Sequence, residues 1–428
     1  MDAVFHELVA GALDEVRRRE PDYLARFPLA FPSVSEQAER YRQHPRFARY
    51  PAAEIEEALA AGIARFAGQG ASVREVGGVI ADPVAELMLD SVVDAAAAER
   101  RDLQLDPRMP QSGRPLAEIL ANGYDERRTP AGTRYFIGRR GDRPLVLVNA
   151  CGIPLAVWSK FLGDRSHGFR IVVVESRTAD VVDGGMRAYT DLTVDADDIA
   201  AVLDHASVDQ ADILGWCSGG KLAIELANRR PERIRSLVLL SITLRGIRGV
   251  ERQPNAFEDN MGQIFSAVSQ RPTMARIFAK SFQQQEKAQF VDWASLADDP
   301  ARRAATLFGM PAKEHASALT APMLQPEFLA NYGRRMTFDE AYPIDEVLSR
   351  LNLPVLAISG DHDTVVDNAL TCKGLRRWGP PAVHARVKGS GHYVHDLQYP
   401  YFRSILTDFL AGREPVGSAR VEVERLER

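Results

Sequence analysis

Residues 214–220 read LGWCSGG, and this stretch decides how the chain is expected to fold. An apolar run precedes it and a helical pattern follows it, so a strand is predicted to end and a helix to begin here. The glycines permit a sharp turn that exposes one reactive side chain. A Gly-x-Cys-x-Gly frame centred on Cys217 is complete, whereas a frame centred on Ser218 would need glycine where Trp216 stands. Cys217 is therefore the predicted nucleophile, and a buried cysteine in a glycine-rich turn is the alternative.

Short apolar runs and helical patterns alternate on both sides of this turn. Such alternation requires right-handed crossovers and gives a mostly parallel sheet with helices on both faces. The sequence therefore predicts an α/β fold, interrupted by a helical insertion at about 245–349. The predicted strands are 125–129, 133–139, 145–149, 170–174, 211–214, 234–240, 354–359 and 383–387, and the helices between and after them are 193–205, 219–229 and 401–410.

The chain of 428 residues is too long for one ordinary core and is expected to form three parts. A helical N-terminal domain is predicted over 1–123, because apolar residues recur there at helical spacing. The α/β domain is predicted over 124–412. Residues 413–428 are charged and show no clear apolar face, so a loose C-terminal tail is expected.

Composition excludes several classes of function. Lys and Arg total 53 against 58 Asp and Glu, a net charge of −5, so no basic field indicates nucleic acid. No run approaches the ~18 apolar residues of a membrane span, and the first residues lack a signal-peptide pattern, so a cytoplasmic protein is expected. Three widely separated cysteines predict no disulfide framework, and no ligand spacing indicates a metal or a bound cofactor.

The turn at 214–220 resembles the nucleophile elbow of the α/β-hydrolase superfamily, in which most members carry serine instead of cysteine. The resemblance implies a nucleophile, an acid and a histidine in that order along the chain. A later ISGDHD segment supplies the acid, which is implied to be Asp363, with Asp361 as the alternative. A KGSGH segment then supplies His392 as the base, and the nearby His395 is expected on a loop surface.

The same resemblance implies two backbone donors for the oxyanion of acyl transfer. One is the N–H group of Ser218, directly after the nucleophile. The other belongs to the loop that follows the predicted strand 145–149, where relatives usually have His-Gly-x and this chain has NACGIP. Counting back from Trp158, which matches a tryptophan often found there, makes Cys151 the implied second donor. Its thiol is interpreted as incidental, and a redox or second acyl-carrying role is the alternative.

A cysteine nucleophile favours transfer over hydrolysis on chemical grounds. The start of a helix lowers the pKa of a thiol, because the positive end of the helix dipole favours thiolate. The thiolate forms a thioester, which stays reactive. If the donor and the acceptor are also thiols, each exchange is nearly isoenergetic and the group can be passed on, whereas a serine ester would trap it.

Two families with a cysteine elbow are similar to residues 124–410. The chain resembles the aminoacyl-shuttling transferases of nonribosomal peptide assembly lines, and its turn is also similar to that of polyhydroxyalkanoate synthases. The first resemblance implies an acyltransferase that moves an (amino)acyl group between the phosphopantetheine arms of acyl or peptidyl carrier proteins. The alternatives are a thioesterase or esterase with the same triad, and a binding protein on an inactive hydrolase scaffold.

The insertion stands where lids usually sit in the superfamily, so it is expected to shield a thioester from water. Its arginines are candidates for binding a pantetheine phosphate or an acidic carrier surface, and solvated surface arginines are the simpler interpretation; they are Arg245, Arg248, Arg252, Arg334 and Arg335. The apolar residues that could line an acyl pocket or form plain core are Phe257, Met261, Ile264, Phe265, Val268, Met274, Ile277, Phe278, Phe282, Phe290 and Trp293.

Overall fold

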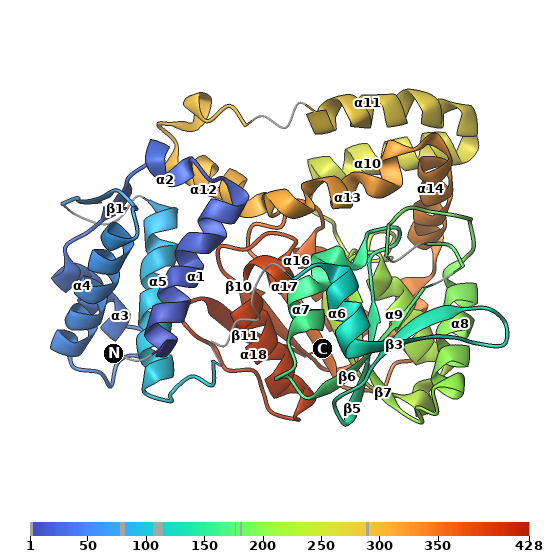
Figure 1. The fold of residues 1–428 in the computed structure, drawn as a ribbon, viewed down its shortest axis with the longest axis horizontal. Coiled ribbons are helices and arrows are strands. Elements are labelled where there is room, and N and C mark those ends of the chain that lie inside the picture. Colours follow the sequence, from blue (N-terminus) through green and yellow to red (C-terminus); the bar gives the residue numbers. More distant parts are fainter. Residues whose placement is uncertain are drawn as a thin grey trace.

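A computed structural model describes residues 3–77, 82–105, 114–175, 177–179, 182–287 and 291–427. Its centre is a nine-stranded sheet (Figure 1). The strands from β10 to β6 pair in parallel, whereas β11, β4 and β3 pair antiparallel at the two edges. The predicted mostly parallel α/β sheet is confirmed. Across the sheet the strands are β11 (Val421–Leu426), β10 (Ala382–Val387), β9 (Val355–Gly360), β8 (Ile234–Leu240), β7 (Ala211–Trp216), β5 (Arg143–Val148), β6 (Phe169–Val174), β4 (Arg134–Gly138) and β3 (Tyr124–Arg128).

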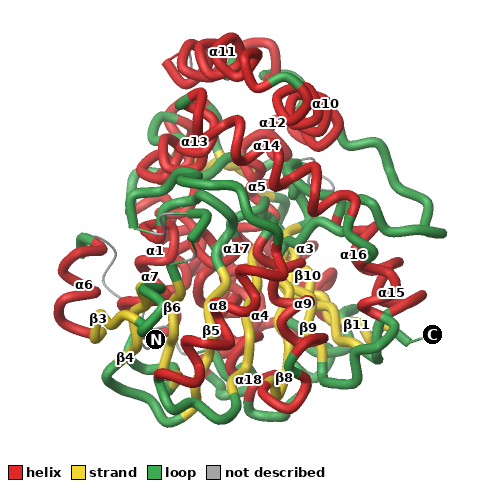
Figure 2. Tube along the Cα trace, turned by 90° about the vertical axis from the view of Figure 1, so that its right-hand side faces the viewer, coloured by secondary structure: helices red, strands yellow, loops and turns green. Residues whose placement is uncertain are grey.

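Helices cover both faces of this sheet, as Figure 2 shows. The central strands are buried on both sides, which explains why their sequences are apolar throughout instead of alternating. The loops after β5, β7, β9 and β10 meet at the carboxyl ends of parallel strands, the edge where such sheets place their sites. One face packs on α8 (Leu192–His205), α9 (Gly219–Arg229), α15 (Ile344–Leu348) and α16 (Asn368–Trp378), and the other on α6 (Leu116–Gly123), α7 (Ser159–Gly163), α17 (Val394–Leu397) and α18 (Tyr399–Leu410).

The stretch before β3 is mostly helical, as predicted, but it also contains a two-stranded parallel sheet that the prediction missed. Strands of three residues are too short to show a period of two in the sequence. Its core extends into the insertion, since Leu307 and Phe308 pack with the side chains of α1 and α5. The elements are α1 (Ala3–Arg19), α2 (Tyr23–Arg26), β1 (Leu29–Phe31), α3 (Val34–Arg42), α4 (Ala52–Gly68), β2 (Val73–Glu75) and α5 (Pro83–Glu99).

The expectation of a loose tail at 413–428 is wrong. β11 pairs with β10 over six residues and closes one edge of the sheet. The Asp94 carboxylate on α5 accepts hydrogen bonds from the backbone N–H groups of Ala419 and Arg420, and the Arg420 side chain is 2% exposed. The sequence VEVERL alternates apolar and charged residues, which is typical of an edge strand exposed on one face, and the high charge hid this pattern.

The insertion between β8 and β9 is helical, as predicted, and it lies over the carboxyl ends of the strands (Figure 1). Its helices reach towards both the elbow and the N-terminal stretch. Among the residues that the structure describes, no helix combines the length and the apolar character needed to cross a bilayer. The helices of the insertion are α10 (Ala256–Gln270), α11 (Ala275–Lys287), α12 (Pro300–Gly309), α13 (Ala316–Leu324) and α14 (Pro326–Ala341).

Candidate active site

Cys217 lies in the turn between β7 and α9 with a backbone φ of 51°, a strained conformation for a residue with a side chain. The turn is tight because neighbouring backbone and side chains crowd its glycines. A Cβ atom on Gly215 would lie 2.8 Å from the Cβ of Ala223. A Cβ atom on Gly219 would lie 2.5 Å from the carbonyl oxygen of Val148. The predicted sharp strand–turn–helix unit is therefore present, with the cysteine at its tip.

Replacing Gly219 with alanine is expected to destabilise the protein, because the new Cβ would meet the carbonyl oxygens of both Val148 and Asn149. Backbone atoms of a central strand cannot move aside, so a loss of about 1–3 kcal/mol in the free energy of unfolding is expected. Urea unfolding measures it. The control is Gly11→Ala on α1, where a Cβ meets nothing within 4 Å and a gain of about 0.5–1 kcal/mol is expected. Equal stability of the two variants would contradict the steric argument.

The structure brings His392 and Asp363 to the elbow from the loops after β10 and β9. The Nδ1 atom of His392 lies 3.0 Å from one Asp363 carboxylate oxygen and 3.2 Å from the other. The carboxylate also accepts hydrogen bonds from two backbone N–H groups and the Asn368 amide, which fix its position. With one ring nitrogen of His392 held by Asp363, the other is available for the Cys217 thiol.

Electrostatics at this contact favour a charged imidazole. Burial opposes protonation of His392, but the charges of Asp363 and Cys217 and hydrogen bonds to both raise its pKa to about 10. Burial likewise opposes ionisation of Asp363, whose pKa is nevertheless lowered by His392, Asn368 and the backbone N–H donors. The carboxylate and the imidazolium are therefore buried, and the partly exposed sulfur of Cys217 stands at the cavity end of this chain of three groups.

Asp361 and His395 lie near Cys217, His392 and Asp363, but their contacts are structural. The Asp361 carboxylate accepts a hydrogen bond from the Ser390 backbone N–H, so Asp363 and not Asp361 contacts the imidazole. His395 was expected on a loop surface, and this prediction is wrong. Its ring is 1% exposed and stacks on Trp158 at 3.9 Å between centroids, with Trp216 at 4.7 Å. Burial lowers the pKa of His395 to about 3, so its ring is neutral.

The two residues implied as oxyanion donors, Ser218 and Cys151, are adjacent in the structure. The backbone N–H of Cys151 donates to the Ser218 hydroxyl oxygen at 2.9 Å, so this N–H already has an acceptor. This hydrogen bond has to break before the Cys151 N–H can donate to an oxyanion. The thiol of Cys151 contacts the Met186 sulfur at 3.3 Å, and burial raises the pKa of this thiol to about 12. Cys151 is therefore a protonated thiol, unsuited to act as a second nucleophile.

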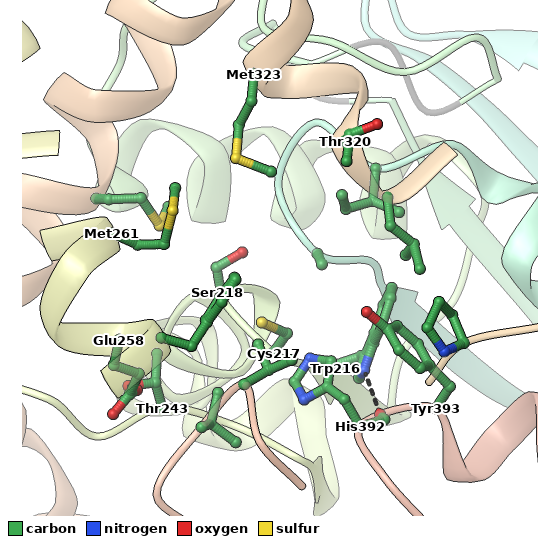
Figure 3. A pocket seen from close by; sticks show the side chains of 18 of the residues that line it. Trp216, Cys217, Ser218, Thr243, Glu258, Met261, Thr320, Met323, His392 and Tyr393 are labelled. Atoms are coloured by element: carbon green, nitrogen blue, oxygen red, sulfur yellow. Dashed lines mark hydrogen bonds between the residues drawn. The ribbon is translucent and has the colours of Figure 1, made fainter. Parts of the chain in front are cut away.

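A cavity of about 720 Å³ opens at Cys217 and His392 beneath the insertion (Figure 3). Ser218 and Tyr393 lie at its floor, whereas Met261 and Met323 reach into it from two helices of the insertion. Flexible methionine side chains adapt to ligands of different shape. The apolar part of the lining includes Phe257, Met261, Phe265, Met310, Met323 and Met336.

Three of the apolar residues that were pocket candidates thus line the cavity, and the others divide between core and surface. Trp293 packs with the N-terminal stretch. Ile277 is 67% exposed, and Phe290 lies outside the described residues. The remaining candidates pack in the core of the insertion: Ile264, Val268, Met274, Phe278 and Phe282.

Several polar residues of the cavity were missed from the sequence. Lys221, on the first turn of α9, donates to the carbonyl oxygens of Arg245 and Asp339, and burial lowers its pKa to about 8. Its position in the LGWCSGGK segment was the available signal. Tyr332 and Tyr393 also line the cavity, and burial together with the Cys217 charge raises the pKa of both phenols. They remain neutral hydrogen-bond donors beside the sulfur.

The arginines that were candidates for a phosphate or carrier surface are mostly occupied by carboxylates of the chain itself. Arg335 is buried, which contradicts the interpretation as a solvated surface residue, and only Arg245 of the group lines the cavity. Arg334 is half-buried on α14. The ion pairs are Arg245 with Glu340, Arg248 with Asp345 and Glu346, Arg252 with Glu258 and Asp259, and Arg335 with Asp195 and Asp339.

One group of possible metal ligands exists among the described residues, and it lies away from the cavity. Cys372, His384 and Glu424 approach one another beside β10 and β11. The two ring nitrogens of His384 already contact Ser359 and Glu424, and burial raises the pKa of the Cys372 thiol to about 12. This arrangement is that of a hydrogen-bonded structural cluster.

Comparisons with known proteins agree with this architecture. Residues 143–399 match the model of the α/β-hydrolase fold family. The 2-hydroxymuconate semialdehyde hydrolase of Pseudomonas sp. (strain CF600) is 27% identical over 134 residues, which are 31% of this chain and only 44% of that protein. The pimeloyl-[acyl-carrier protein] methyl ester esterase of Yersinia enterocolitica is 24% identical over 272 residues, 63% of this chain and 93% of that protein.

A bromoperoxidase from Bacillus anthracis superposes with a TM-score of 0.50 at 16% identity, over 67% of this chain and all of that one. At this identity the likeness concerns the fold alone. The family match is independent of it and covers more than half of the chain. The protein therefore belongs to the α/β-hydrolase fold family, and residues 1–142 precede the part of the chain that matches the family model.

Proposed function

We propose that the protein is an acyltransferase that moves an acyl or aminoacyl group between the phosphopantetheine thiols of two carrier proteins through a thioester on Cys217. The observation that carries the proposal is a thiol, in place of a hydroxyl, held against His392 at the floor of a cavity of about 720 Å³. His392 acts as base and acid, and Asp363 orients it. The backbone N–H groups of Ser218 and Cys151 are the proposed oxyanion donors.

The proposed reaction balances without a further reactant. The Cys217 thiolate attacks the carbonyl carbon of the incoming thioester, and the oxyanion collapses with loss of the pantetheine thiolate, which takes the proton of the His392 imidazolium. In the second half, neutral His392 takes a proton from the second pantetheine thiol. That thiolate attacks the acyl group and releases Cys217. Each half exchanges one thioester for another.

Two carboxyl groups of the cavity favour an aminoacyl group. Glu258 and Asp339 are 8% and 5% exposed, and both line the cavity. One oxygen of each has no hydrogen-bond partner in the part of the chain that the structure describes. Burial raises the pKa of both carboxyls, as expected where solvation is lost. The Glu258 oxygen lies 3.7 Å from the Arg252 guanidinium, whereas the acidic pair as a whole would attract a substrate ammonium group to this end of the cavity.

Hydrolysis is the second candidate, and the relatives favour it. The matched proteins include a hydrolase of a semialdehyde and an esterase named for a methyl ester on an acyl carrier protein. On the same triad, neutral His392 would activate water instead of a second thiol. A carrier-bound acyl group is a suitable substrate for both candidates, and they differ only in the acceptor.

Intact-mass measurement separates the two. The protein is mixed with a panel of carrier proteins loaded with aminoacyl or fatty-acyl groups. An unloaded holo carrier is then added. Transfer predicts a mass adduct on Cys217 that disappears as the second carrier becomes loaded. Release of free acid at a rate that the second carrier does not change would establish hydrolysis. Absence of any adduct or turnover across the panel would refute carrier-bound substrates.

A further inference from the structure

Helix α11 forms the outermost layer of the insertion, above α10 and α13 (Figure 2). Its inner face is accounted for: Ala275 and Ala279 are buried in the core of the insertion, and Phe278 packs against it. The outer face presents Arg276, Ile277 and Lys280, spaced as neighbours on a helix surface. This outer face, together with Arg271 just before the helix, is called the α11 face below, and none of the site residues above belongs to it.

The α11 face combines an apolar centre with positive charge. Ile277 is 67% exposed, the most exposed large apolar side chain of the described residues. Arg276 and Lys280 flank it, and Arg271 lies just before the helix; all three are exposed. Among the residues that the structure describes, none of these three cations has an ion-pair partner.

The local charge is the reverse of the charge of the whole chain. Between Asp259 and Glu286 the sequence contains no acidic residue, although acidic residues outnumber basic ones overall. Arg245, Arg248, Arg252 and Arg335 of the insertion pair with carboxylates of the chain. Arg271 and Arg276 are exposed and pair with no carboxylate in the described part of the chain. A surface of this kind attracts a partner with an acidic surface and a small apolar patch.

The cavity reaches the surface beside this face. Gln285, near the end of α11, and Phe257, at the start of α10, both line the cavity and are both exposed. The Glu286 carboxylate accepts a hydrogen bond from the Thr320 hydroxyl of α13, which holds the end of α11 over the cavity. A partner seated on the α11 face therefore stands next to an opening that leads to Cys217.

We propose that the α11 face is the docking surface for an acidic carrier domain, with Ile277 as its apolar anchor and Arg271, Arg276 and Lys280 as its charged rim. The proposal rests on the proposed function, because it names where the carrier of that reaction binds. A domain docked here delivers its pantetheine arm to the opening beside Gln285. The three cations supply long-range attraction, which raises the rate of encounter more than the final affinity.

The test compares two thioesters of the same acyl group, one on the carrier that acylates Cys217 fastest and one on the small thiol N-acetylcysteamine. The variants are Arg276→Glu/Lys280→Glu and Ile277→Ala. The matched control is Arg230→Glu/Arg350→Glu, two arginines just before β8 and β9, at the amino ends of the strands, away from the site. The rate of Cys217 acylation is followed by intact mass at low and at physiological salt.

The charge reversal is expected to lower carrier-dependent acylation at least about 10-fold, with a weaker salt dependence than the native protein. Ile277→Ala is expected to lower it less and without a change in salt dependence. Acylation by the small thioester is expected to stay within about twofold in both variants. Equal losses with both thioesters, or no loss with the carrier, would overturn the docking proposal. Failure of the native protein to react with either thioester would instead refute the proposed function.

Discussion

Replacing Cys217 with alanine is expected to abolish the acyl adduct and to lower transfer between carriers by about 10³-fold or more, since removal of a nucleophile leaves only binding and oxyanion contributions. Replacing it with serine is expected to have a different result. A serine hydroxyl is a weaker nucleophile than a cysteine thiol, and any ester that it forms is a poorer acyl donor to a thiol than a thioester is.

The serine variant therefore distinguishes transfer from hydrolysis. If the enzyme transfers acyl groups between carriers, the Cys217→Ser variant is expected to accumulate as an acyl ester. A second holo carrier is expected to accept the acyl group from this ester about 10²-fold more slowly than from the native thioester. Intact mass against time measures both species. Cys151→Ser is the control, because that thiol is protonated and is expected to carry no acyl group. Turnover of the serine variant close to the native rate, with free acid as product, would support hydrolysis.

The central sheet and the elbow were predictable because their sequence signals are local. Apolar runs with helical patterns between them specify a parallel sheet, and the glycine spacing around Cys217 specifies the turn. Asp363 and His392 were predictable because each follows a strand whose end lies at the same edge as the elbow. The structure adds the contact between them, at 3.0 Å.

The parts that sequence reasoning missed depend on packing between distant segments. The tail appeared loose because its charges hid an alternating strand, and the Asp94 carboxylate that holds it lies on α5, far away in the sequence. His395 appeared to be a loop residue because nothing local shows that Trp158 and Trp216 enclose it. Arg335 was interpreted as a surface arginine and Lys221 was not singled out, but both are buried in contacts with Asp339.

Replacing Asp363 with asparagine is expected to lower the rate of Cys217 acylation by about 10²–10⁴-fold, because an amide no longer fixes the imidazole tautomer or stabilises its charge. A shift in pH dependence is the more specific result. Burial alone would lower the pKa of His392. The Asp363 charge is the largest of the interactions that oppose this effect and raise the pKa to about 10. Without that charge the pKa of the imidazole falls, so the alkaline limb of the rate profile moves to lower pH.

The same shift has a defined sign for stability. A pKa raised from about 6.5 to about 10 stabilises the folded protein fully below pH 6.5, and this contribution is lost as pH rises towards 10. Between pH 6 and 10, Asp363→Asn is therefore expected to lose most stability at pH 6 and least at pH 10. Acylation by a small thioester and urea unfolding, each from pH 6 to 10, measure the two effects.

The matched control is Asp361→Asn, because the Asp361 carboxylate contacts the Ser390 N–H instead of the imidazole. An equal displacement of the alkaline limb in the Asp361 variant would show that general loop disorder, and not the Asp363 charge, sets the protonation of His392.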